Sequence, residues 1–250
     1  KKSKYYYLRA VKSKKVFSQS LICVIIIYSY RGGKMIYAIG DLHLDSTDLK
    51  PMGVFGGNWQ DHDKKIKTSW LEKVKDDDLV LLPGDISWAM RFSEAIDDLK
   101  FIDELPGKKL ISKGNHDYWW TSISKMNGFG FKSIYFMQND SYTYKDYAIC
   151  ATRGWMQEDN DKYDEENDKK ITARELIRLS LSLEKADKDK KIIVMLHYPP
   201  FNMDLEANQF HELMKEHGVY KCVYGHLHAA GHRFRREGLI DGIDYSLVSS

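Results

Sequence analysis

Cysteine is scarce in this chain of 250 residues, and its placement excludes one class of protein at once. The three cysteines, Cys23, Cys150 and Cys222, form no close pair and no CxxC motif. An odd number of separated cysteines does not provide the disulfide framework on which small secreted domains depend. We therefore expect a protein of a reducing compartment and predict a cytoplasmic location.

The sequence also lacks an apolar run long enough to cross a membrane. Its most apolar segment, Leu21–Tyr28, is well short of the about 20 apolar residues that a bilayer core requires. The segment follows a basic start, as in a signal peptide, but no small-residue cleavage pattern comes after it. Secretion is one alternative. The favoured interpretation takes Met35 as the natural start and residues 1–34 as an extension outside the fold, leaving one domain over residues 35–250 and no membrane association.

The body of the chain has no excess of basic charge. Residues 1–34 hold nine of the 38 lysines and arginines and no acid, so residues 35–250 carry 29 basic against 36 acidic side chains. An acidic body disfavours a nucleic-acid-binding surface, whose affinity comes largely from contacts with phosphates. A small phosphate ester or nucleotide fits better as a substrate, while a nuclease remains an alternative.

Strand and helix patterns alternate in the first half of the body. Short apolar runs predict strands at Met35–Gly40, Leu79–Pro83 and Lys109–Ser112. Apolar residues spaced three and four apart predict helices at Asp61–Val74 and Phe92–Leu105. This order is typical of a parallel α/β sheet.

The second half contains a β-rich meander followed by the same alternation. The acidic stretch 157–170 is expected to be a solvated loop. Together the two halves predict two sheets flanked by helices. The expected strands are 133–136, 141–144, 147–151, 191–196, 219–224, 233–236 and 244–248, and the expected helices are 118–126, 171–185 and 205–215.

Polar side chains follow these strands at the points where the strands end. Loops at the carboxyl ends of parallel strands meet in one crevice, so residues far apart in sequence are expected to form one site. Histidines and carboxylates together suit divalent transition metals. The predicted metal ligands are Asp41, His43, Asp85, Asn115, His197, His226 and His228.

Seven ligands exceed the needs of one ion, so two metal ions are expected. A natural division gives Asp41, His43 and His228 to one ion, gives Asn115, His197 and His226 to the other, and lets Asp85 bridge them. Two ions about 3.5–4 Å apart can hold a bridging hydroxide as nucleophile and clamp phosphoryl oxygens.

A further histidine beside these ligands is available for proton transfer. The ordinary pKa of a histidine is near 6.5, so His116 is predicted to act as general acid toward the departing oxygen. The adjacent Asp117 is a possible orienting partner. Arg153, after the strand at 147–151, is a candidate for gripping a phosphate, and a surface position is an equal alternative.

Five short blocks together resemble the signature of calcineurin-like metallophosphoesterases. They are Asp41-Leu42-His43, Gly84-Asp85, Gly114-Asn115-His116-Asp117, His197 and Gly225-His226-Leu227-His228, in matching order and spacing. The resemblance implies a four-layer α/β/β/α sandwich of two mixed sheets, the metallo-dependent phosphatase fold. It also implies a dinuclear site holding manganese, iron or zinc, and hydrolysis of a phosphodiester or phosphomonoester.

Departures from this pattern narrow the expected activity. The protein Ser/Thr phosphatase branch resembles Gly-Asp-x-Val-Asp-Arg-Gly at the second block, whereas residues 84–90 here lack that arginine. A branch of small bacterial predicted phosphohydrolases is most similar, and we expect manganese first among the three metals. A non-catalytic metal-binding scaffold of the same fold remains an alternative.

Overall fold

Two β-sheets form the centre of the protein in the computed structural model, which describes residues 25–29, 34–47, 50, 52 and 59–250. The first sheet has five strands in the order β1-β2-β3-β4-β5. Strands β2 to β5 run parallel, and β1 pairs antiparallel with β2. The strands are β1 (Ile25–Ser29), β2 (Met35–Ala38), β3 (Leu79–Leu82), β4 (Lys108–Ile111) and β5 (Ile134–Phe136).

The second sheet has six strands in the order β10-β11-β9-β8-β7-β6. Its four central strands, from β11 to β7, run parallel, and the strand at each edge is antiparallel to its neighbour. Both sheets are therefore mixed. The strands are β6 (Ser141–Tyr144), β7 (Tyr147–Thr152), β8 (Lys191–Leu196), β9 (Lys221–Tyr224), β10 (Gly238–Ile240) and β11 (Ile243–Leu247).

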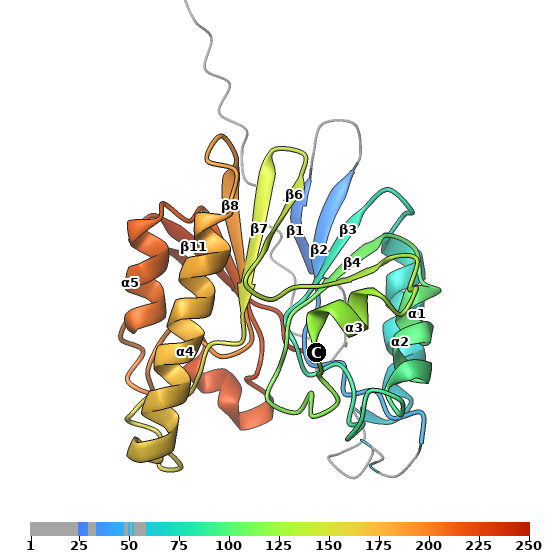
Figure 1. Ribbon diagram of the computed structural model, residues 1–250, viewed down its shortest axis with the longest axis horizontal. Coiled ribbons are helices and arrows are strands. Elements are labelled where there is room, and N and C mark those ends of the chain that lie inside the picture. Colours follow the sequence, from blue (N-terminus) through green and yellow to red (C-terminus); the bar gives the residue numbers. More distant parts are fainter. Residues whose placement is uncertain (1–24, 30–33, 48–49, 51, 53–58) are drawn as a thin grey trace, which may run out of the picture.

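Helices cover the outer face of each sheet. Figure 1 shows α1 and α2 beside the first sheet and α4 and α5 beside the second, with the two sheets between them. Within the described residues, no helix has the length and apolar character needed to cross a membrane. The helices are α1 (His62–Lys73), α2 (Ile96–Asp103), α3 (Ile123–Asn127), α4 (Glu165–Glu184), α5 (Gln209–Glu216) and the 3-10 helix η3 (Ala229–Phe234).

Three separate apolar cores confirm the four-layer arrangement. Successive side chains of a strand point to opposite faces of its sheet. In β3, Val80 packs in the core shared with α1 and α2, whereas Leu81 packs between the sheets. In β7, Cys150 packs in the core under α4 and α5, whereas Ile149 packs between the sheets. Both sheets are thus buried on both faces, which gives the predicted α/β/β/α sandwich.

The start of α4 corrects one prediction from the sequence. The stretch 157–170 was expected to be a loop, but its last six residues belong to α4. Asp164 caps this helix by accepting hydrogen bonds from the backbone N–H groups of Glu166 and Asn167. Acids in the first turn also interact favourably with the helix dipole. The acidic charge that suggested a loop therefore belongs to a helix start.

A second correction concerns the expected strand at 233–236. Residues Ala229–Phe234 form the 3-10 helix η3, and the edge strand β10 begins only at Gly238. Gly238 has a positive φ of 91°, a conformation that glycine adopts without steric cost. The edge strand therefore starts at this residue and pairs with β11.

The segment before Met35 is described only in part. Residues 25–29 form β1, which extends the first sheet beyond β2. Residues 1–24 and 30–33 lie outside the described part of the chain, so the predicted division at Met35 stays a prediction.

Candidate metal centre

The loops after β2 and β3 run side by side and carry three of the predicted ligands. The backbone N–H of Asp41 donates to Gly84 O at 3.0 Å, and that of His43 donates to Asp85 O at 3.0 Å. Leu42, between the first two ligands, is fully buried and anchors the loop in the core under α1 and α2. Because of this pairing, the side chains of residues 41, 43 and 85 reach the same space.

Four predicted ligands have an unusual backbone conformation. The φ angles are 60° at Asp41, 46° at His43, 53° at Asp85 and 72° at His226. Residues other than glycine rarely adopt this left-handed region, and each such residue costs about 1–3 kcal/mol. Strain of this kind persists where the surrounding structure enforces it, and it is concentrated at functional sites.

Two glycines leave the room that the carboxylates occupy. A Cβ atom on Gly114 would overlap the side chain of Asp85, and a Cβ atom on Gly225 would overlap Oδ2 of Asp41. Any larger residue at either position would displace a carboxylate. The glycines in the third and fifth sequence blocks therefore have a steric role in the site.

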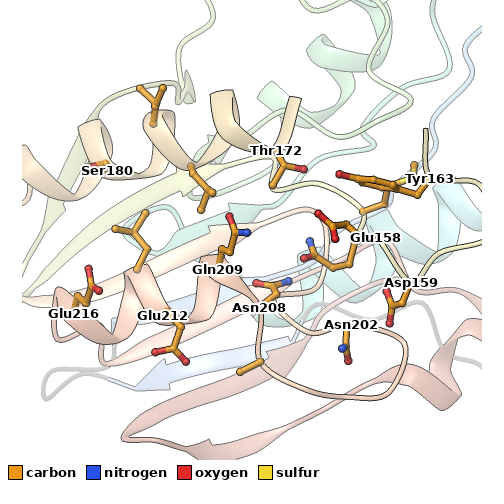
Figure 2. Close-up of a pocket in the computed structure, with 16 residues that line it drawn as sticks. Glu158, Asp159, Tyr163, Thr172, Ser180, Asn202, Asn208, Gln209, Glu212 and Glu216 are labelled. Carbon is orange, nitrogen blue, oxygen red and sulfur yellow. The ribbon is translucent and has the colours of Figure 1, made fainter. Parts of the chain in front are cut away.

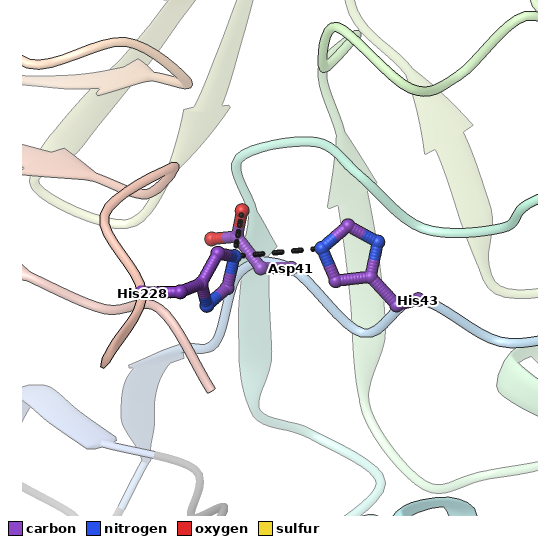
Figure 3. A group of neighbouring side chains, drawn as sticks. All are labelled: Asp41, His43 and His228. Atoms are coloured by element: carbon purple, nitrogen blue, oxygen red, sulfur yellow. Dashed lines mark hydrogen bonds and ion pairs between the residues drawn. The ribbon is translucent and has the colours of Figure 1, made fainter. Parts of the chain in front are cut away.

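The first group of ligands consists of Asp41, His43 and His228 (Figure 3). The Nε2 atoms of His43 and His228 lie 3.4 Å apart, and Nε2 of His228 lies 3.2 Å from Oδ1 of Asp41. Asp41 comes from the loop after β2 in the first sheet, and His228 follows β9 in the second. The group therefore spans the two sheets.

The second group consists of Asn115, His197 and His226, with Asp85 beside it. Oδ1 of Asn115 lies 2.6 Å from Nε2 of His197 and 2.9 Å from Nδ1 of His226. Oδ2 of Asp85 is 3.5 Å from Nε2 of His197 and 3.9 Å from Nε2 of His43. One carboxylate oxygen thus faces both groups, as expected for a bridging residue.

Hydrogen bonds around the site fix the orientation of its side chains. Nδ1 of His197 donates to Pro83 O at 3.0 Å, which leaves Nε2 with a free lone pair toward the site. The backbone N–H of His226 donates to both oxygens of Asp41, at 3.1 and 3.0 Å. Such surrounding bonds hold metal-binding side chains in place before an ion arrives.

Burial keeps most of these imidazoles neutral. It lowers the pKa of His43, His197 and His226 to about 3 in each case. For His228, burial also lowers the pKa, but the hydrogen bond and charge of Asp41 outweigh it and raise the pKa. The neutral imidazole is the form that coordinates a metal ion.

The side chains fit divalent cations by their chemistry. Carboxylate, amide and imidazole lone pairs converge, and no described lysine or arginine forms an ion pair with Asp41 or Asp85. Burial and the neighbouring charges of Asp117 and Asp41 raise the pKa of Asp85. This set of side chains therefore lacks a positive charge, which a bound cation would supply. Imidazole and carboxylate ligands together suit transition metals.

His116 and Asp117 occupy different surroundings. The backbone N–H of His116 donates to Oδ1 of Asp85 at 2.8 Å, and its half-buried ring lies 5.9 Å from that of His43. The carboxylate of Asp117 is fully buried and accepts hydrogen bonds from backbone N–H groups and from the Trp119 indole. The backbone donors belong to Asp85, Ile86, Ser87 and Gly114.

Asp117 was considered as a possible orienting partner of His116, but the two side chains form no hydrogen bond with each other. Nδ1 of His116 has no partner among the described residues, and the bonds of Asp117 go elsewhere. Asp117 therefore holds the loops after β3 and β4 together instead of orienting the His116 ring.

Arg153 has partners of its own. Its guanidinium lies 3.3 Å from Oε1 of the buried Glu175, which also pairs with Arg178, and it stacks over the Trp155 ring at 4.1 Å. Its backbone oxygen accepts from the N–H groups of His197 and Tyr198. The guanidinium is thus paired in this structure, and phosphate binding by Arg153 stays a prediction.

Aromatic rings at the site were not predicted from the sequence. Trp88 stacks on His43 at 4.8 Å between ring centroids, and Tyr198 lies 4.2 Å from His226. Each ring belongs to the same loop as a predicted ligand, three residues after Asp85 and one after His197. That proximity in sequence was the available signal.

Three comparisons place the chain among known proteins. The family model for calcineurin-like phosphoesterases matches residues 34–230. The search of curated proteins found no match. Among solved structures, the phosphopantetheinyl hydrolase of Mycobacterium tuberculosis is similar, with a TM-score of 0.54, 16% identity, and coverage of 86% of this chain and 88% of that chain. A protein of unknown function from Aquifex aeolicus has a TM-score of 0.46 and 16% identity, with coverage of 87% and 90%.

Proposed function

Because the chain belongs to the calcineurin-like phosphoesterase family, we propose that it hydrolyses a small phosphodiester or phosphomonoester with two bound divalent metal ions. Metal-dependent phosphohydrolysis as such follows from the family. The proposal of two metal ions rests on one observation: two groups of predicted ligands face the same carboxylate oxygen of Asp85. One group is Asp41, His43 and His228, and the other is Asn115, His197 and His226.

We propose that the first group holds one ion, the second group holds the other, and Asp85 contacts both. Two divalent ions held by these residues would supply polarisation of the phosphoryl oxygens and activation of the attacking water. The ligand set suits manganese, iron and zinc, of which we propose manganese first. The buried histidines are neutral, so they are ready to coordinate without first losing a proton.

The remaining chemistry falls to residues beside the ligands. In the hydrolysis, an oxygen–phosphorus bond forms from water, the ester oxygen–phosphorus bond breaks, and the departing oxygen takes up a proton. We assign the donation of that proton to the His116 imidazole. Two contacts hold this residue beside the first group: its backbone N–H donates a hydrogen bond to Asp85, and its ring lies 4.5 Å from the Trp88 ring. Asp117 acts as a positioning residue, through the backbone of the two loops that it joins.

A substrate smaller than a nucleic acid fits the charge of the chain. The body beyond residue 34 has more acids than bases, and strong binding to a polyanion needs basic contacts. A nuclease is therefore the less favoured alternative. The retained His116 and the complete set of ligands also favour an enzyme over a metal-binding scaffold.

The test compares two chromogenic esters with the full-length chain. The protein is stripped of metal, resupplied with manganese, and assayed on bis-p-nitrophenyl phosphate and p-nitrophenyl phosphate. We expect turnover that falls about 100-fold or more in Asp85→Asn, because this change removes the carboxylate between the groups. The exposed Asp76→Asn serves as control and should keep full activity.

The outcomes separate the alternatives. The preferred ester distinguishes a diesterase from a monoesterase. Two tightly bound metal ions without turnover of any phosphate ester would instead support the scaffold. Salt-sensitive binding and cleavage of DNA would support the nuclease.

A further inference from the structure

A large cavity lies between the helices α4 and α5, outside the metal centre. Its volume is about 790 Å³. Figure 2 shows Thr172 and Ser180 of α4 on one side, Glu212 and Glu216 of α5 on the other, and Tyr163 near one end. A volume of this size falls within the range of small-molecule binding sites.

A smaller hollow of about 70 Å³ lies beside this cavity and borders the metal centre. Its lining includes the predicted ligand His226 and the neighbouring Tyr198. The two hollows share four lining residues, which are Met156, Gln157, Asp159 and Asn202. The two hollows therefore lie side by side; together they are called here the α4–α5 groove, which extends from a predicted ligand outward between the two helices.

The charge of the α4–α5 groove has one sign. Glu158, Asp159, Glu212 and Glu216 line it, and no lysine or arginine does. None of these four carboxylates forms an ion pair with a described lysine or arginine; the one ionic contact among them is a 3.9 Å approach of His211 to Glu212. Asp241 and also Glu212 raise the pKa of Lys215, so the described part of the chain balances the negative charge of the groove only in part.

Apolar surface accompanies this charge. Leu176 and Leu213 line the large cavity together with Ile177, whose exposed fraction of 61% is high for an isoleucine. The inner hollow adds the aromatic rings of Trp155 and Phe234. Both rings already have an arginine guanidinium over them, Arg153 over Trp155 and Arg233 over Phe234, so they add apolar surface only. A group that fits the groove has an apolar stem and a positively charged end, since the unpaired carboxylates attract a cation.

We infer that the α4–α5 groove binds one organic group of the substrate, and that this group is an extended chain ending in an amine or quaternary ammonium. This inference rests on the proposed function and specifies its substrate as an amino-alkyl phosphodiester. The phosphate lies at the metal centre, the stem passes His226, and the cation reaches the acids between α4 and α5. Substrates with a second anionic group are disfavoured, because like charges repel in the groove.

The test uses three chromogenic diesters of matched length. These are p-nitrophenyl phosphates whose second ester group is aminohexyl, hexyl or carboxypentyl, and kcat/KM is measured for each with the manganese-loaded full-length protein. We expect the aminohexyl ester to exceed the hexyl ester about three- to tenfold at low salt and the carboxypentyl ester to be slowest. The preference should shrink at high salt, since several of the carboxylates are solvent-exposed.

Two variants test whether the preference for the aminohexyl ester depends on the acids of the α4–α5 groove. The double variant Glu158→Gln/Glu212→Gln should bring the ratio of aminohexyl to hexyl kcat/KM close to one. Glu72→Gln, an exposed change on α1 away from the groove, should leave that ratio as in the wild type. Equal turnover of all three esters by the wild type, or an unchanged ratio in the double variant, would overturn the inference.

A binding measurement separates this inference from the proposed function. The same three esters are titrated by calorimetry into Asp85→Asn, in which hydrolysis is expected to be lost. Tighter binding of the aminohexyl ester than of the hexyl ester there supports the groove, even if the wild type cleaves none of the esters and the proposed function fails. Equal binding of the two esters there contradicts the groove, whatever the turnover.

Discussion

The imidazoles of His43 and His228 face each other across the metal centre with their Nε2 atoms 3.4 Å apart, although 185 positions separate them in sequence. Two nitrogen lone pairs do not approach this closely without a proton or a cation between them. The carboxylate of Asp41 lies 3.2 Å from the same nitrogen of His228. A cation bound here would take up both nitrogen lone pairs in place of a shared proton and would also gain the attraction of the Asp41 carboxylate.

This relationship predicts that metal ions stabilise the fold. Chelation should lower the unfolding temperature, and manganese in about 100-fold excess over its dissociation constant should raise it again by about 5–10 °C. Differential scanning calorimetry on the metal-stripped and reloaded protein measures the shift. Asp85→Asn should show a smaller shift than Asp76→Asn. The same unfolding temperature with and without manganese, zinc or iron would contradict a metal site here.

Replacing His116 should slow the reaction according to the leaving group. His116→Asn removes the proposed proton donor, so esters with alkyl leaving groups should lose about 100-fold or more in kcat. Esters of p-nitrophenol should lose much less, since nitrophenolate departs without a proton. Measuring kcat over a series of leaving groups checks this difference, and a structural role alone would lower all rates equally.

Replacing Asp117 should destabilise the protein. Its carboxylate accepts bonds from four backbone N–H groups and one indole, whereas an asparagine at this position would present an NH2 group to some of these donors. Asp117→Asn is expected to cost about 2–4 kcal/mol in the free energy of unfolding. Urea denaturation measures it, with the exposed Asp76→Asn as control. A change below about 0.5 kcal/mol would show that the loops do not depend on this carboxylate.

Replacing Arg153 distinguishes its two roles. Because the guanidinium pairs with the buried Glu175, Arg153→Gln should cost about 1–2 kcal/mol of stability and leave KM within about twofold. Arg178 also pairs with Glu175 and limits the loss. Arg91→Gln, an exposed change, is the control. A tenfold rise in KM at unchanged stability would support the phosphate contact predicted from the sequence instead.

Local patterns in the sequence predicted the inner strands and failed at several boundaries. Runs such as Leu79–Leu82 are buried along their whole length, so their apolar composition identifies them directly. The predicted strand at 233–236 was wrong, because periodicity does not specify where a glycine turn begins an edge hairpin. The start of α4 at Glu165 was missed because a run of acidic residues looks the same in the sequence whether it caps a helix or forms a loop.

The sequence by itself determined the family and the residue types of the site. Histidine, asparagine and aspartate follow the ends of predicted strands in a fixed order, and this order can be recognised without knowing any distance in the folded protein. Only the tertiary structure decided how these groups meet and what surrounds them. In the folded protein, Asp117 accepts hydrogen bonds from backbone N–H groups and Arg153 pairs with Glu175. An acidic groove between α4 and α5 also lies near His226. The physical reason is that hydrogen bonds, ion pairs and cavities depend on the packing of distant segments, which no local pattern records.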